Sequence, residues 1–339
     1  MNKNNPLVSV ILPVYNNEQY LVEAIQSILN QTHSNFEFFI LSSANTNLES
    51  LAIIDSFHDK RIKHVRRAPD ENLPKALNHG IEMSRGVYIA RMDADDIALP
   101  LRFEQQVKFM ESHPDISIAG TWAKTFGARD ECIKQATEPD EIKVSLLFQT
   151  SIVHPTVIFR KSDIDKYHLR YNPDFSYSED AEMWARCVKQ VKIANIPEVL
   201  LLYRVHPEQA TYVGKEKHSA LREEVKKEQL ISLGIMPTRE ELALHMMICA
   251  FEVSDLAGFL DKAERWLLRI INSNKKVNFY DQKILEKVIG YRWYALSLVV
   301  SKKFGFTVWK KFWKSSLSSF FPKTPGNIFR LCKAYIKTI

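Results

Sequence analysis

The sequence predicts an α/β protein with a mainly parallel central sheet and helices on both faces, followed by a helical region. Up to about residue 92, short apolar runs alternate with segments of helical spacing, and this repetition is typical of a parallel sheet. After about residue 215 only helical spacing remains, with no convincing strand. We therefore expect two domains, at residues 1–214 and 215–339.

Apolar runs in the first domain predict buried strands, and the segments between them predict helices. Strands are expected at residues 8–12, 36–41, 62–65 and 87–92, and helices at 18–31 and 73–83. Pro13 is expected to end the first strand. Because ligands bind beyond the carboxyl ends of the strands in such sheets, residues 93–96 are candidates for a functional site.

Four segments of the second domain carry the periodicity of helices. They are residues 215–235, 238–254, 256–272 and 281–300.

Composition indicates an ordinary globular protein outside an oxidising compartment. The four cysteines, at positions 132, 187, 249 and 332, are far apart, which argues against a disulfide framework and against a zinc site. No window reaches the roughly 18 to 20 apolar residues of a membrane-spanning helix, since the best one, residues 288–300, contains Arg292. We expect a cytoplasmic protein, peripheral on the inner face of the cell membrane.

The C-terminal region is basic and aromatic together. Residues 287–339 contain eleven Lys and Arg and no Asp or Glu, so the rest of this chain of net charge +6 is acidic. Within residues 304–321, aromatic residues recur at helical spacing, and most lysines lie away from that stripe. This pattern favours contact with an anionic membrane surface. The alternative is a helix that packs its apolar face on the first domain and leaves its lysines in water. No segment matches a nucleic-acid-binding fold.

The densest cluster of acidic residues follows the strand predicted at residues 87–92. Asp93, Asp95 and Asp96 lie within four residues, and like charges this close require a compensating cation or solvent. Mg²⁺ or Mn²⁺ held by carboxylates and substrate phosphates would supply that cation. The alternative is a solvated acidic turn before the helix that begins near Pro100.

Several motifs, in order along the chain, resemble those of the family 2 glycosyltransferases, which have the nucleotide-sugar-binding GT-A fold. They are VSVILPVYNN at residues 8–17, ALNHGI at 76–81, RGVYIARMDADD at 85–96, Pro100 with Arg102, Glu104 and Gln105, SEDAEMW at 178–184, and LYRVH at 202–206. The similarity extends over residues 7–212. It implies a GT-A domain at residues 1–214.

The resemblance also implies roles for individual residues. Asp180 would be the general base, and Asp95 and His206 would hold the metal. Donor-binding positions would be Pro13, Tyr15, Asn16, Ser43, Asn78, Arg91, Asp93 and Arg204. His154 would shape the acceptor side.

Alternatives remain for three of these positions. Glu179 and Asp180 are also favourable as negative charges at the start of a helix. His206 could be a surface histidine before Pro207, and Arg204 could pair with a nearby acid.

The chain departs from the family pattern after its second strand. Ser42 and Ser43 stand where the family has two aspartates, one of which reads the uracil ring. A neutral hydroxyl is a weaker acceptor than a carboxylate, so the base is held more weakly, or another group reads it, or the donor is not uridine-based. Otherwise the serines cap the next helix. Asn72 stands where the family prefers glycine, and asparagine tolerates the left-handed conformation.

The combined interpretation is an inverting, metal-assisted glycosyltransferase that moves a sugar from a nucleotide-sugar, with a UDP-linked donor expected, to a cell-surface glycan or lipid-linked saccharide. Within the family the chain is most similar to lipooligosaccharide β-1,3-N-acetylglucosaminyl- and galactosyltransferases. Two alternatives remain, a non-catalytic nucleotide- or glycan-binding module with a decayed site and a nucleotidyltransferase. A nucleotidyltransferase would normally have a glycine-rich basic loop where this chain has PVYNN.

Overall fold

The computed structural model consists of two compact units. It describes residues 5–16, 18–68, 71–207, 209, 215–252, 256–304, 306–321, 324 and 326–327. The α/β unit comprises residues 1–142 and 150–222, and the helical unit comprises residues 143–149 and 223–339. The helical unit therefore includes seven residues that interrupt the α/β unit in the sequence.

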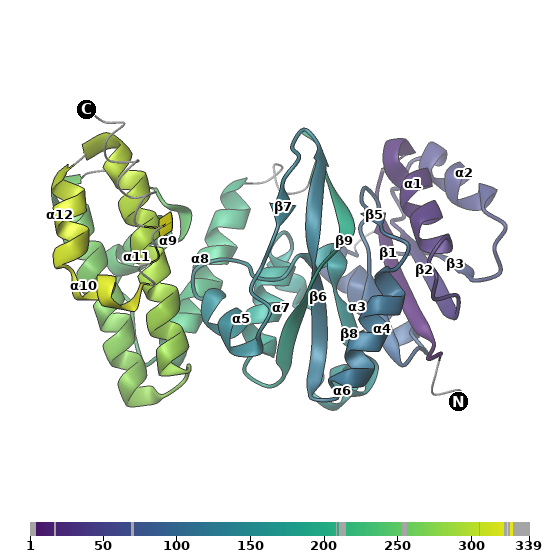
Figure 1. Ribbon diagram of the computed structural model, residues 1–339. Coiled ribbons are helices and arrows are strands. Elements are labelled where there is room, and N and C mark those ends of the chain that lie inside the picture. The colour runs from purple at the N-terminus through teal and green to yellow at the C-terminus, as the bar shows by residue number, and fades with distance from the viewer. Residues whose placement is uncertain are drawn as a thin grey trace. The chain divides into compact units, whose positions relative to one another are not determined.

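The α/β unit is built on one curled sheet (Figure 1). In the described residues the strand order is β3-β2-β1-β4-β8-β6-β9-β5, with β7 beside β6. The strands are β1 (Val8–Val14), β2 (Phe36–Ser42), β3 (Ile62–Arg66), β4 (Tyr88–Arg91), β5 (Ile97–Ala98), β6 (Ile116–Gly127), β7 (Cys132–Ile133), β8 (Ile158–Arg160) and β9 (Lys192–Val205).

The strands β1, β2, β3 and β4 pair in parallel, as the sequence predicts. The pairs β1–β2, β1–β4 and β2–β3 are parallel, and so is β6–β9. β8 lies antiparallel between β4 and β6, and this return of the chain was not predicted. The predicted fold class, a mostly parallel sheet with helices followed by a helical region, is confirmed.

Helices of the α/β unit lie close to the predicted positions. They are α1 (Glu18–Leu29), α2 (Leu48–Ser56), α3 (Leu73–Met83), α4 (Arg102–Ser112), α5 (Pro139–Ser145), α6 (Lys161–Lys166) and α7 (Glu179–Cys187), with 3-10 turns η1 (His154–Thr156) and η2 (Pro173–Phe175). Leu21 and Ile25 of α1 pack with Val10, Leu12 and Phe38 of the strands in one buried core. Each such side chain contributes about 1.5–3 kcal/mol when fully buried.

The first strand continues past Pro13, contrary to the prediction. Its backbone pairs with β2 as far as Val14. β4 accompanies it only to Ile11, so the side of Pro13 that lacks an N–H faces no further strand. Proline is tolerated at such an edge because no ladder hydrogen bond is lost.

The helical unit contains the helices expected after residue 215. They are α8 (Lys215–Ser232), which begins within the α/β unit, α9 (Arg239–Ala250), α10 (Leu256–Val277), α11 (Gln282–Phe304) and α12 (Phe306–Lys314), with a 3-10 turn η3 (Ser316–Phe320). α9 begins where Thr238 and Glu241 form a reciprocal capping box. α11 packs against α10, α12 and η3, and its side chains form much of the core.

The aromatic stripe of the C-terminal region faces this core. Phe312 is 1% exposed, Leu317 and Phe321 are buried with it, and Trp309 and Trp313 pack against the same cluster. The apolar face of this helix is therefore packed within the helical unit, whereas the alternative expected it to pack on the first domain. Burial against α11 removes the stripe from water, and contact of the basic region with an anionic membrane stays a prediction.

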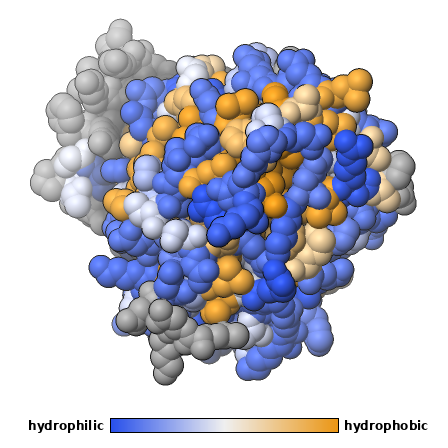
Figure 2. Space-filling model, turned by 90° about the vertical axis from the view of Figure 1, so that its right-hand side faces the viewer, coloured by the Kyte–Doolittle hydropathy of each residue, from blue (hydrophilic) through white to orange (hydrophobic). Residues whose placement is uncertain are grey.

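Among the described helices, none is long and apolar enough to cross a bilayer. Figure 2 shows the side of the molecule on which α1 and α2 lie, with hydrophobic residues interspersed among hydrophilic ones, as is normal for a folded surface. Cys132, Cys187 and Cys249 are free thiols.

Candidate active site

Three carboxylates meet where the chain leaves β4. Oxygen atoms of Asp93, Asp95 and Asp96 all lie within 4.8 Å of one another. This edge is formed by the carboxyl ends of the parallel strands β1, β2 and β4, where ligands bind in α/β sheets. The sequence therefore predicted the position of the cluster correctly.

The cluster is short of positive charge. Asp96 is buried, its Oδ1 accepts the Arg204 N–H at 2.8 Å, and its Oδ2 has no partner. Burial, followed by repulsion from Asp95 and Asp93, raises the pKa of Asp96 well above its ordinary value. Burial also raises the pKa of Asp93, with a further contribution from Asp95. A cation at this position would relieve both effects.

The donor atoms of the cluster fit a divalent metal ion. They are mainly carboxylate oxygens, which Mg²⁺ and Mn²⁺ prefer. His206 is added from the end of β9, with Nε2 3.1 Å from Asp95 Oδ2. The unpartnered Oδ2 of Asp96 is a further available ligand atom. The structure thus joins the two predicted metal residues, Asp95 and His206, and adds Asp96, to which the sequence analysis gave no role.

Arg91 lies beneath the cluster and is itself buried. Its Nη1 donates to Asp93 Oδ2 in an ion pair, and its Nε has no partner. The Arg91 charge also acts on Glu179, where it lowers the pKa against the larger effect of burial. Arg91 therefore holds Asp93 in place, and it links the carboxylates after β4 to those that begin α7.

Asp180, the predicted base, lies at the start of α7 and is half-buried. Its charge contributes to the raised pKa values of Asp93 and of the Tyr171 hydroxyl, so it lies near both side chains. Asp180 Oδ1 accepts the N–H of Ala181 at 2.7 Å. The structure therefore brings the predicted base and the carboxylates after β4 into one site.

Glu179 is a site residue to which the sequence analysis assigned no catalytic role. It is 7% exposed, and its Oε2 has no hydrogen-bond partner. Burial, followed by repulsion from Asp180, raises the pKa of Glu179 to about 7. Glu179 is therefore partly protonated near neutral pH, unlike an ordinary surface glutamate.

His154 and Tyr171 complete this side of the site. His154 Nε2 lies 2.9 Å from the Tyr171 hydroxyl, and Nδ1 lies 4.0 Å from Glu179 Oε1. Burial, with a further contribution from Arg91, lowers the pKa of His154 well below its ordinary value, so the ring is neutral. Tyr171 is not part of any motif identified in the sequence, and only the fold brings it here.

Four of the predicted donor-binding residues lie at the ends of β1 and β2. Pro13 pairs with Leu41 near the end of β1, and Tyr15 is 59% exposed. Asn16 has a left-handed backbone with φ of 49°, and its Oδ1 accepts the Asn47 N–H at 2.8 Å. The Ser43 N–H donates to Val14 O at 3.1 Å, which joins the two strand ends.

The serines that replace the family aspartates do not cap α2. Asn47 caps it, because its side chain accepts the Ser50 N–H. Ser42 is buried, and its hydroxyl lies 2.9 Å from His64 Nε2. Ser43 Oγ accepts the Asn45 N–H at 3.3 Å and is half-buried, so only Ser43 is accessible to a ligand.

Two predicted donor-binding side chains are engaged elsewhere. Asn78 donates to Tyr171 O and accepts the Tyr171 N–H, both at 2.8 Å, so it fixes the backbone that carries the Tyr171 ring. Arg204 donates to Asp95 O at 2.7 Å and pairs with Glu23, and its guanidinium lies 4.3 Å from the ring centroids of Tyr20 and Phe126. Its pairing with an acid is the alternative that the sequence left open.

Asn72 does not use the left-handed conformation. It has φ of −73° and ψ of 173° and caps α3 through its side chain. The family glycine is therefore replaced by an ordinary N-cap residue.

The raised pKa of Glu179 predicts a pH-dependent stability. The folded protein holds this proton more tightly than the unfolded chain, so the stabilisation is complete below about pH 4.5 and is lost as pH rises through about 7. Glu179→Gln should therefore gain stability relative to wild type between pH 5 and pH 8, by about 2–3 kcal/mol. Urea denaturation at both pH values measures it. Glu198→Gln, at an exposed carboxylate, controls for net charge, and parallel curves for wild type and Glu179→Gln would contradict the assignment.

Comparisons with known proteins agree with this site. The model of glycosyl transferase family 2 matches residues 9–175. An uncharacterized glycosyltransferase of Haemophilus influenzae is 32% identical over 241 residues, 67% of this chain and 74% of the relative. The O-antigen biosynthesis glycosyltransferase WbnJ of Escherichia coli is 33% identical over 207 residues, 59% of this chain and 80% of that protein.

A solved structure shares the fold. Residues 1–349 of S. aureus TarS, in complex with UDP-GlcNAc, superpose with a TM-score of 0.57 and 15% identity, covering 86% of each chain. With the strand order and the carboxylates described above, these comparisons show that the chain belongs to glycosyl transferase family 2.

Proposed function

We propose that this glycosyltransferase is inverting and metal-assisted, with Asp180 as the general base. The observation that carries the proposal is the convergence of Asp180 with the carboxylates that follow β4. The carboxylates and the base come from segments far apart in sequence, and a solvated acidic turn would not explain why Arg91 is buried between them.

The proposed reaction is a single in-line displacement. The acceptor hydroxyl attacks the anomeric carbon, the bond from that carbon to the diphosphate oxygen breaks, and Asp180 takes the hydroxyl proton. A carboxylate on the acceptor side, opposite the leaving group, gives inversion at the anomeric carbon. Asp93, held by Arg91, would orient the donor ribose. Asp95, Asp96 and His206 would hold Mn²⁺ or Mg²⁺, which supplies Lewis-acid stabilisation of the departing diphosphate when bound.

The donor is proposed to be a nucleotide-sugar, with UDP the first candidate. Pro13, Tyr15 and Ser43 lie together at the ends of β1 and β2, and Ser43 offers the accessible hydroxyl. A hydroxyl would accept a ring N–H less strongly than the family carboxylate. Calorimetric titration of UDP, GDP, CDP and dTDP would rank the bases, and a preference for GDP would overturn this choice.

The acceptor is proposed to be a cell-surface glycan or a lipid-linked saccharide. WbnJ is named for O-antigen biosynthesis, which supports this class. Within this class of acceptors, we propose that the enzyme is a lipooligosaccharide β-1,3-N-acetylglucosaminyl- or galactosyltransferase. Transfer to a panel of saccharide acceptors, with the linkage assigned by NMR, would test it, and an α-linked product would contradict both the finer assignment and inversion from an α-linked donor.

Replacement of the base should remove chemistry and spare donor binding. Asp180→Asn is expected to lower kcat by about two to four orders of magnitude, because proton transfer is lost while the size of the side chain is kept. The Kd for UDP should stay within about threefold. Glu182→Gln, on the same helix and paired with Arg186, is the matched control. A kcat within threefold of wild type for Asp180→Asn would assign the base elsewhere, and absence of product from wild type with every donor would favour the non-catalytic alternative.

Removal of the metal ligand should abolish turnover. Asp95→Ala is expected to be inactive, and excess EDTA should silence wild type until Mn²⁺ or Mg²⁺ is restored. Binding of Mn²⁺ alone, followed by calorimetry, gives a readout independent of activity. Full activity in EDTA would contradict the metal assignment.

We propose that lysine side chains of the C-terminal region, and not its aromatic side chains, contact an anionic membrane surface. Lys310 and Lys314 are exposed on α12, whereas the aromatic stripe is buried. Each lysine near such a surface contributes about 1 kcal/mol, so Lys310→Ala/Lys314→Ala should weaken binding to phosphatidylserine vesicles about tenfold or more. Lys108→Ala/Lys189→Ala, at two exposed lysines of the α/β unit, is the control. Equal sedimentation of the two double variants with the vesicles would contradict the proposal.

A further inference from the structure

A short segment from the middle of the chain supplies part of the core of the helical unit. We call residues 138–150, which include α5, the plug loop. Its residues 143–149 belong to the helical unit by their contacts, although the chain on either side belongs to the α/β unit. Most of these seven residues are packed rather than exposed.

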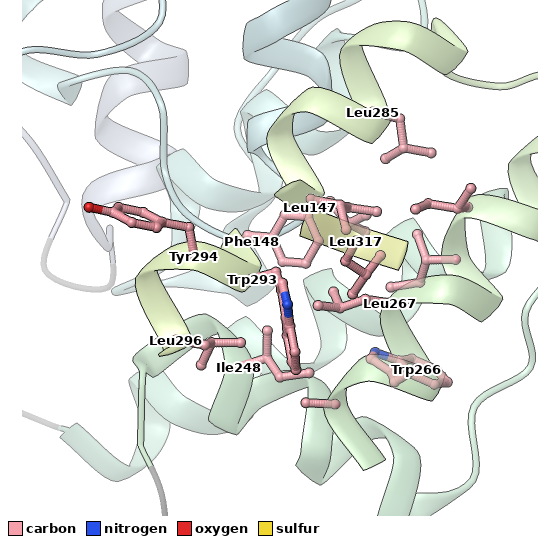
Figure 3. Packing of buried hydrophobic residues seen from close by; sticks show 14 of the residues in the cluster. Leu147, Phe148, Ile248, Trp266, Leu267, Leu285, Trp293, Tyr294, Leu296 and Leu317 are labelled. Atoms are coloured by element: carbon pink, nitrogen blue, oxygen red, sulfur yellow. The ribbon is translucent and has the colours of Figure 1, made fainter. Parts of the chain in front are cut away.

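The tip of the plug loop is hydrophobic and buried. Val144 and Leu147 are 0% exposed and Phe148 is 2% exposed, all within the main cluster of the helical unit. Figure 3 shows Leu147 and Phe148 among the side chains of the helices, including Trp293 and Leu317. The helical core is therefore incomplete without this segment.

Polar groups of three helices bind the tip. His245 Nε2 donates to Leu147 O at 3.0 Å, and this direction is fixed because His245 Nδ1 accepts the Trp266 indole N–H at 3.0 Å. Lys226 donates to Leu146 O. These donors satisfy carbonyls just beyond the end of α5, where a helix leaves them unpaired.

Arg292 binds the end of the tip. It is buried, donates to Gln149 Oε1 at 2.9 Å and lies 5.2 Å from the centroid of the Phe148 ring. Burying a guanidinium without a carboxylate partner costs free energy, so the hydrogen bond to Gln149 and the contact with the Phe148 ring help to compensate the buried charge. Within the described residues no ion pair to a carboxylate is found for Arg292.

The two ends of the plug loop are held together in the α/β unit. Asn195 Nδ2 donates to Ala136 O at 2.7 Å and to Ser151 O at 2.8 Å, and the Asn195 N–H donates to Thr137 O at 3.1 Å. A Cβ at Gly120 would lie 2.3 Å from Asn195 Oδ1, so glycine leaves room for this side chain. Asn195 on β9 therefore closes the base of the loop.

The plug loop leads directly to the active site. His154 is five residues after Gln149, a span of at most about 18 Å. Ser151 and Ile152 between them are buried, and Gln106 donates to Thr156 O just after His154 at 2.7 Å. Only a short, packed stretch of chain therefore separates the tip from His154.

We propose that Phe148 and Arg292 are positioning residues of the transferase, because seating the plug loop in the helical unit fixes the chain that carries His154. His154 in turn is held to Tyr171 beside Glu179. The helical unit is then required for turnover and not only for stability. The catalytic part of this inference rests on the proposed function.

The test compares two phenylalanine truncations in the full-length protein. Phe148→Ala should increase amide hydrogen exchange of residues 150–157 and 171 at least tenfold. It should also lower kcat about tenfold or more, while the Kd for UDP changes less than about twofold. Phe312→Ala removes the same atoms from the same core, and its ring contacts are Tyr294, Trp313 and Phe321, none of them in the loop. It should leave both readouts near wild type below its melting temperature.

Two outcomes overturn the proposal. One is that Phe312→Ala matches Phe148→Ala in exchange and kcat, which would mean general loss of stability. The other is that Phe148→Ala changes neither quantity. If Phe148→Ala does not fold, Arg292→Met takes its place. Arg292→Met should lower kcat, and Arg292→Lys should restore it. A kcat of Arg292→Met equal to that of wild type would contradict the proposal. If wild type shows no transfer, the proposed function fails, while the exchange data still decide whether the loop controls residues 150–157.

Discussion

The active site depends on one electrostatic constraint, the gathering of five carboxylates beside two buried arginines. Asp93, Asp95 and Asp96 follow β4, Glu179 and Asp180 begin α7, and Arg91 is a buried cation between the two groups. Arg102 is also buried, and its charge interacts with those of Asp96 and Asp93. Two arginines do not neutralise five acids, and the raised pKa values of Asp96 and Glu179 express that deficit. The deficit after β4 suits a divalent ion. On the side of α7, burial lowers the pKa of His154, so its neutral ring adds no positive charge.

Some of the strands that position these carboxylates could be predicted from the sequence, and others could not. β1 to β4 are short apolar runs, and their parallel order follows from the alternation with helices, so periodicity alone located them. β6 and β9 are long, partly exposed strands with register shifts between them, and their sequence pattern lacks a clear period. β8 has only three residues. The half of the sheet that contains β6, β8 and β9 is thus fixed by pairings between distant segments, which no local pattern encodes.

Site residues divide in the same way. Asp93, Asp95, Asp180 and His206 lie in motifs whose resemblance to the family implied their roles. Tyr171 and the burial of Glu179 are legible only in three dimensions, because Tyr171 is placed by the side chain of Asn78 on α3. Asn78 and Arg204 were assigned to the donor by their motifs, yet their polar groups are used within the protein. A motif shows that a residue is constrained, but it does not distinguish contact with a ligand from support of a neighbour that makes the contact.

The C-terminal region shows that an amphipathic helix pattern fits two structures, a helix at a membrane surface and a helix packed in a protein core. A stripe of aromatic residues opposite lysines minimises its exposure to water equally well in a membrane or in a core, since the hydrophobic effect is not directional. What decides is whether the protein offers an apolar partner, and here α11 does so for Phe312 and Phe321. The core of the helical unit also requires residues 143–149, whose apolar side chains are buried among its helices. The helical unit includes residues 143–149 as well as the helices after residue 222, so its core is built from two segments that are far apart in the sequence.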